Sequence, residues 1–319
     1  MDQNFERHVR RLTRLLFLSQ SLGSAAFIAG STVGALVGAA LSGQTALAGL
    51  PGAVYLGGSA LAAYPAARFM EREGRRRGLT AGFGLGLVGA LVVGGAVLAH
   101  NFLVFLAGFF MLGAARGFTD LGRYAAAEMH APAERGRAIS LVVLGGTFGA
   151  VAGPALVGPA GQIAERLGAD QLAGPWFGSA ALLLLGAVLI AAFLRPDPSE
   201  LGRRLGDSPV VAQVGGPVRG WGVLLKDGRV VTALGALILG QGVMVMLMSM
   251  TSLHMRGHQH GLGDISLVIS SHTLGMYGPS LFSGRLVDRW GRVPMIALGA
   301  GLLVAACETP YAVLDPVPE

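Results

Sequence analysis

Long apolar segments separated by short polar ones dominate this chain. A helix needs about 20 mostly apolar residues to cross roughly 30 Å of hydrocarbon. Nine segments meet this requirement: residues 15–41, 45–67, 79–99, 101–128, 138–160, 173–194, 230–253, 265–284 and 294–312. The pattern predicts an all-α, polytopic helical membrane protein.

The longest polar interruption covers residues 195–229 and divides the predicted helices into unequal groups. It is rich in Pro, Gly, Arg and Asp, a composition typical of a linker. We therefore predict a six-helix half at residues 1–194, a linker at 195–229, and a partial half of three helices at 230–319.

The composition agrees with a membrane environment. Hydrophobic residues make up 52% of the chain and charged residues 13%, whereas a soluble domain carries about a quarter charged residues. The 51 glycines lie within apolar runs, where small residues let membrane helices approach closely. The first apolar run is too long for a cleaved signal peptide, so we expect a retained first span.

The basic residues are distributed unevenly between the two sides of the predicted spans. Twenty of the 24 Lys and Arg residues fall on the side of the N-terminus, and two, Arg166 and Arg256, fall on the other. Cytoplasmic loops carry such an excess, so we predict a cytoplasmic N-terminus in a plasma or inner membrane. Basic residues scattered between apolar segments argue against a nucleic-acid partner.

A nine-residue charged phrase occurs twice, as A-R-F-M-E-R-E-G-R at residues 67–75 and G-R-L-V-D-R-W-G-R at residues 284–292. Both copies fall in predicted cytoplasmic loops, and such repetition suggests a membrane protein built from two similar halves. The candidate functional positions of the phrase are Arg68, Glu71, Arg72, Gly74 and Arg75 in the first copy, and Gly284, Asp288, Arg289, Gly291 and Arg292 in the second.

These features resemble the major facilitator superfamily, whose members have two six-helix halves joined by a cytoplasmic loop. That family carries G-x-L-x-D-R-x-G-R between helices two and three, and again between helices eight and nine. The second copy here matches fully, whereas the first has Ala67 for Gly and Glu71 for Asp. The resemblance implies a conformational latch between helices, and the simpler alternative is a cluster of topology-determining charge.

The fifth predicted span resembles a second signature, the G-x-x-x-G-P-x-x-G-G helix of many exporters. Gly149, Gly153, Pro154 and Gly158 fit this pattern, with Val157 where a glycine is usual. Proline removes a backbone hydrogen bond and bends a helix. The signature favours a bend and a close helix contact here, and it favours export over uptake.

The resemblance implies secondary active transport of a small solute by alternating access, with proton coupling, in a monomer. Family members have twelve helices and nine are predicted here, so we expect a truncated form. A non-transporting remnant or a ligand-sensing membrane protein is the alternative.

The fourth predicted span contains four charged residues: Arg116, Asp120, Arg123 and Glu128. Charges at membrane depth are costly and usually face a cavity or a partner. The spacing places Arg116, Asp120 and Arg123 close together on a helix. One interpretation makes Asp120 a proton-titrating group and Arg116 an anion contact. The other is a static ion-pair cluster, with Arg123 and Glu128 reaching the cytoplasmic headgroups.

Other polar residues at membrane depth are candidates for the cavity. The family places helices one, four and seven along its cavity, which implies Ser24, Asp120 and Gln241 as lining residues. His272 could titrate near neutral pH, or it could simply contact a neighbouring helix.

The sequence offers little support for metal binding or enzyme chemistry. Alternate methionines at 244–250 precede His254, His258 and His260, a combination that soft metals favour. Alternate positions fall on different faces of a helix, so we predict no metal site and keep the three histidines as weak candidates. No P-loop, His-Glu-x-x-His or nucleophile-elbow motif occurs, so we predict no enzyme and no cofactor.

Overall fold

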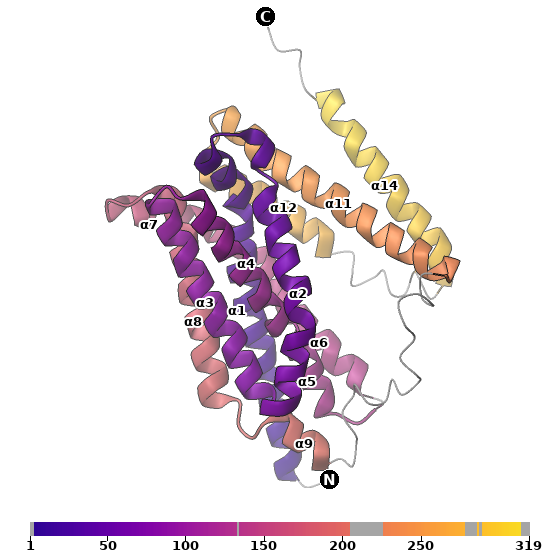
Figure 1. The fold of residues 1–319 in the computed structure, drawn as a ribbon. Helices are drawn as coiled ribbons and strands as arrows, with labels where there is room; N and C mark the ends of the chain where they lie inside the picture. The colour runs from indigo at the N-terminus through magenta and orange to yellow at the C-terminus, as the bar shows by residue number, and fades with distance from the viewer. Residues whose placement is uncertain (1–2, 133, 205–225, 278–285, 287–288, 314–319) are drawn as a thin grey trace, which may run out of the picture. The chain divides into compact units, whose positions relative to one another are not determined.

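The computed structural model describes residues 3–132, 134–204, 226–277, 286 and 289–313. Every regular element in these ranges is a helix (Figure 1), which confirms the predicted all-α fold. Seven described helical segments are long and apolar enough to cross a membrane.

The first six predicted spans correspond to six helical segments of the structure. They are α1 (Gln3–Ser42), α2 (Leu50–Glu73), α3 (Arg75–Leu98), α4 with α5 (Phe102–Thr119 and Gly122–Glu128), α6 with α7 (Arg135–Ala155 and Val157–Arg166), and α8 (Gly174–Phe193). Short 3₁₀ turns, η1 (Thr45–Leu47) and η2 (Gln171–Ala173), precede α2 and α8. The later helices are α9 (Pro198–Arg204), α11 (Gly228–Gly257), α12 (Leu262–Tyr277) and α14 (Arg292–Val313).

Two spans that we expected to be continuous are interrupted. The fourth is broken at Asp120 and Leu121, which separate α4 from α5. The fifth is broken at Leu156, which separates α6 from α7 two residues after Pro154. Pro159 accounts for this second break, because it has no backbone N–H to bond the carbonyl of Ala155 and its ring crowds that carbonyl.

The chain divides into two compact units, residues 1–217 with 247–273, and residues 218–246 with 274–319. In the first unit α1 packs against α6 and α8, α3 packs against α4 and α8, and α2 packs against α4. Trp176 lies at its centre, 1% exposed, with its ring edge-on to those of Phe105 and Phe109. This bundle positions the charged groups described below.

The beginning of the predicted linker is helical. Helix α9 follows α8 after four residues and packs against α5 and α3. Its Leu201 side chain is 2% exposed, within the same hydrophobic core as α3 and α8. The first unit therefore includes a structured segment beyond its sixth span.

Candidate functional site

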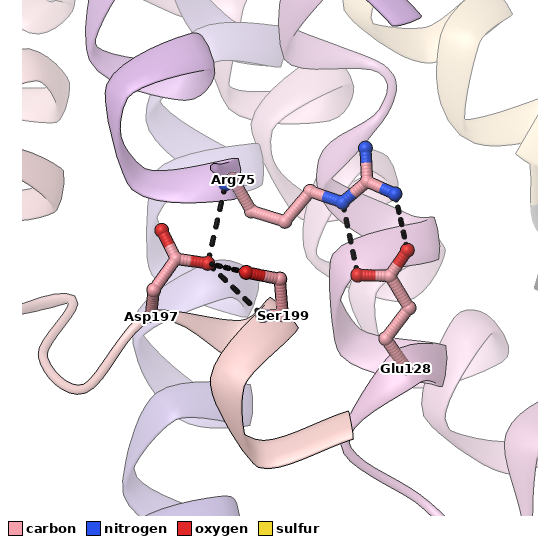
Figure 2. A network of polar contacts seen from close by, with 4 residues as sticks. All are labelled: Arg75, Glu128, Asp197 and Ser199. Atoms are coloured by element: carbon pink, nitrogen blue, oxygen red, sulfur yellow. Dashed lines mark hydrogen bonds and ion pairs between the residues drawn. The ribbon is translucent and has the colours of Figure 1, made fainter. Parts of the chain in front are cut away.

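A buried ion pair joins the first residue of α3 to the last residue of α5. The Nε atom of Arg75 donates to Oε2 of Glu128 over 2.9 Å, and its Nη2 atom donates to Oε1. The two side chains are only 9% and 7% exposed. Two parallel N–H···O bonds of this kind combine strength with a fixed geometry, and Figure 2 shows them side by side.

Asp197, which follows α8, closes the other side of this network (Figure 2). Its Oδ1 accepts hydrogen bonds from the backbone N–H of Arg75 at 3.2 Å, and from the backbone N–H and the hydroxyl of Ser199 at 2.9 and 2.8 Å. Its Oδ2 accepts from the N–H of Arg76 at 2.9 Å. Helix N-termini leave such N–H groups without intrahelical partners, so one carboxylate satisfies groups of both α3 and α9.

The glycine of the first phrase copy is needed by this arrangement. Gly74 has φ of +90°, a region that only glycine enters readily. A Cβ atom there would lie 2.7 Å from Oδ2 of Asp197. Gly291, the equivalent residue of the second copy, has φ of +86° directly before α14. The two copies therefore share a backbone conformation at the start of the following helix.

The remaining residues of the first copy are more exposed. Arg68 donates from Nη1 to the hydroxyl of Tyr64 over 2.7 Å. Glu71 and Arg72 are exposed at the end of α2 and line a cavity of about 310 Å³, together with Arg75 and Asp197. This cavity has both acidic and basic walls.

Only part of the second copy can be placed. Gly284 and Asp288 lie outside the described residues. Arg289 is exposed, and Arg292 begins α14. The role of this copy as a latch stays a prediction.

The network corrects one expectation and adds partners that the sequence interpretation missed. One of the two interpretations placed Glu128 at the lipid headgroups, but it is buried against Arg75 because α5 ends beside the start of α3. Asp197 and Ser199 were treated as linker. The signal was present, since Asp-Pro-Ser-Glu at 197–200 places a capping residue, a proline and a glutamate at the positions that begin a helix.

A second ion pair lies within the fourth span. The Nε atom of Arg116 lies 2.9 and 3.0 Å from the two carboxylate oxygens of Asp120. The Nε2 atom of Gln20 on α1 donates to Oδ1 of Asp120 at 3.4 Å, and the guanidinium carbon of Arg116 lies 5.6 Å from the ring centre of Phe27. The side chains of Arg116 and Asp120 are 25% and 32% exposed. The pair thus links α4 to α1 and keeps one accessible side.

The other cavity candidates have different surroundings. Ser24 is buried on α1, one turn beyond Gln20. Gln241 is exposed in the part of α11 that belongs to the second unit, and His272 is exposed in α12 of the first unit. Arg123 is half-buried, and its guanidinium carbon lies 5.1 Å from the ring centre of Tyr124.

The glycine-proline segment lies directly against α1. A Cβ atom on Gly153 would lie 2.5 Å from the carbonyl oxygen of Ala25, and one on Gly149 would overlap the carbonyl of Ser21. Pro154 lies inside α6, and Gly158 lies in the first turn of α7. Glycine therefore allows the two helix backbones to touch just before the break.

The histidines at the end of α11 do not form a cluster. The rings of His254 and His258 are 4.5 Å apart, and Nδ1 of His260 lies 3.8 Å from a carboxylate oxygen of Asp264. Within the described part of the chain, no three His, Cys, Asp or Glu side chains come close enough to hold a metal ion.

Comparison with known proteins gives a consistent result. The sequence profile described as Major Facilitator Superfamily matches residues 15–308. The chain is 38% identical over 312 residues to an uncharacterized MFS-type transporter, YdeG of Bacillus subtilis, covering 95% of this chain and 71% of that protein. It is 36% identical over 310 residues to YddS of the same organism, covering 96% and 71%. It is 30% identical over 301 residues to the riboflavin transporter RfnT of Brucella anthropi, covering 92% and 71%.

Proposed function

The chain belongs to the Major Facilitator Superfamily, and on that basis we propose that it moves a small solute across a membrane by alternating access, coupled to protons. In this mechanism two helical halves rock around a site near the middle of the bilayer.

The observation that carries proton coupling is the ion pair of Arg116 and Asp120. It lies within a span from Phe102 to Glu128, yet both side chains are partly exposed. An exposed ion pair is costly against lipid, so such groups usually face a water-filled cavity. Protonation of Asp120 would release Arg116 from its partner, which is how a proton can change the affinity for a solute.

Flux into proteoliposomes tests this role directly. We would reconstitute the purified chain and measure uptake of a solute panel with and without an imposed pH gradient. The panel includes riboflavin, because one relative is named for it. We expect the pH gradient to accelerate flux of at least one solute, and Asp120→Asn to remove the acceleration. Acceleration that persists in the Asn variant would exclude Asp120, and no response of any flux to pH would exclude proton coupling.

We assign the repeated phrase a mechanical role. Arg75, Glu128 and Asp197 hold the starts of α3 and α9 to the end of α5, next to the exposed Glu71 and Arg72. Helix ends held together in this way, with exposed charges beside them, suit a latch that engages and releases during alternating access. Loss of the latch should change the rate of solute flux without changing the protein level in the membrane.

Two further features support a direction of transport and an orientation in the membrane. The glycine-proline break between α6 and α7 supports export of the solute, as the sequence signature predicts. The excess of Lys and Arg supports a cytoplasmic N-terminus in a plasma or inner membrane. Inside-out and right-side-out vesicles would separate export from uptake. Labelling of a cysteine introduced before residue 10 by a membrane-impermeant maleimide would reveal an external N-terminus.

A further inference from the structure

We infer, resting on the proposed transport function, that the solute is a small organic anion and that Arg123 contributes to its recognition. The membrane spans carry an excess positive charge, and Arg123 is the side chain that holds it.

Charged residues are nearly absent from the middle of every span except the fourth. Five stretches that contain no Asp, Glu, Lys or Arg cover most of the other spans: residues 15–67, 78–115, 138–164, 171–194 and 230–255. Residues 116–127 contain two arginines and one acid, Arg116, Arg123 and Asp120. With Asp120 ionised, this segment keeps one uncompensated positive charge.

The acids near the fourth span are already engaged by other arginines. Asp120 lies 2.9 Å from Arg116, and both carboxylate oxygens of Glu128 accept from Arg75. Arg123 has a contact with the ring of Tyr124, but its buried Nε atom has no hydrogen-bond partner in the described part of the chain. A buried N–H group without an acceptor is unfavourable, although the Arg123 side chain as a whole is only half-buried.

An anionic solute would compensate the excess positive charge and would also give the Nε–H group of Arg123 an acceptor. A guanidinium presents a planar fork of donors that fits a carboxylate or a phosphate. A polar side chain of α1, Gln20, lies against the residue before Arg123. The Oε1 atom of Gln20 is 3.8 Å from the position that a Cβ would take at Gly122, the preceding residue. A neutral solute would leave the positive charge uncompensated.

Binding of matched pairs of small molecules tests the inference on the whole purified chain. The probes are benzoate with benzamide, and glycerol 3-phosphate with glycerol, measured by calorimetry and by thermal stabilisation. We expect at least one anion to bind about tenfold or more tightly than its neutral partner. Arg123→Gln should remove that preference and Arg123→Lys should retain it. The control Arg10→Gln changes an exposed arginine paired with Glu6 on the same helix, and it should leave the preference unchanged.

The outcomes separate this inference from the proposed function. If no anion binds better than its neutral partner, or if Arg123→Gln retains the preference, anion recognition by Arg123 is wrong. Preferred anion binding without flux in proteoliposomes would contradict transport and support anion recognition. Flux that is confined to neutral solutes would support transport and contradict anion recognition.

Discussion

Replacing Glu128 by Gln should strongly destabilise the first unit. The substitution keeps the size of the side chain but removes its charge, which leaves the Arg75 guanidinium 9% exposed beside a neutral amide. Removing one partner of a buried ion pair costs about 3–5 kcal/mol, because the remaining charge is buried without compensation. One kcal/mol lowers the unfolding temperature of a domain of this size by about 2–4 °C. The expected decrease is therefore roughly 6–20 °C.

The chain provides a matched control for this experiment. Glu73 and Arg77 form an ion pair with a 2.7 Å contact at the same end of the bundle, but their side chains are 43% and 68% exposed. Exposed pairs contribute about 0–1 kcal/mol. Glu73→Gln should therefore shift the unfolding temperature by only a few degrees. Tryptophan fluorescence during heating of the purified protein in detergent reports the transition, since Trp176 lies in the affected core.

A double variant separates charge burial from packing. Arg75→Met with Glu128→Leu removes both charges, and apolar replacement of a buried pair is often neutral or stabilising. The bond from the backbone N–H of Arg75 to Asp197 does not depend on the side chain. We expect the double variant to unfold at a temperature well above that of Glu128→Gln. Equal loss in both, or a shift for Glu128→Gln no larger than that for Glu73→Gln, would refute the reasoning.

Three further substitutions test the other features. Asp197→Ala removes the caps of two helices, at about 1 kcal/mol each. Its unfolding temperature should therefore fall about twice as far as that of Asp170→Ala, which removes one local cap. Equal shifts for the two variants would contradict the double role of Asp197. Gly149→Val should cost about 3 kcal/mol because its side chain meets the backbone of α1, while Gly84→Val, in open space, should change the thermal midpoint little. Asp288→Asn should cripple flux in proteoliposomes with normal protein levels, and unchanged flux would remove the latch role.

The spans could be predicted from the sequence because a membrane imposes a length and a composition on every crossing helix. The expected segment 79–99 corresponds to α3 at Arg75–Leu98, and 173–194 corresponds to α8 at Gly174–Phe193. Local signals also indicated the pairing of Arg116 with Asp120, since residues four apart meet on a helix. These features depend on neighbours in the chain.

The buried network could not be predicted in the same way. Arg75 and Glu128 are 53 residues apart, and Arg75 and Asp197 are 122 apart. Their meeting depends on how α3, α5 and α9 pack, which a hydrophobic pattern does not encode. The break at Asp120 and Leu121 has no proline to announce it. Sequence reasoning therefore found the charged groups but not all of their partners.

The cap that Asp197 places on α3 has a practical consequence for dividing this chain into pieces. A fragment that ends at Phe193, with the sixth span, would lose the carboxylate that binds the N–H groups of Arg75 and Arg76. A fragment that ends at Arg204 keeps that carboxylate and all of α9. Split-protein complementation or exchange of halves between related transporters should therefore place the junction after α9.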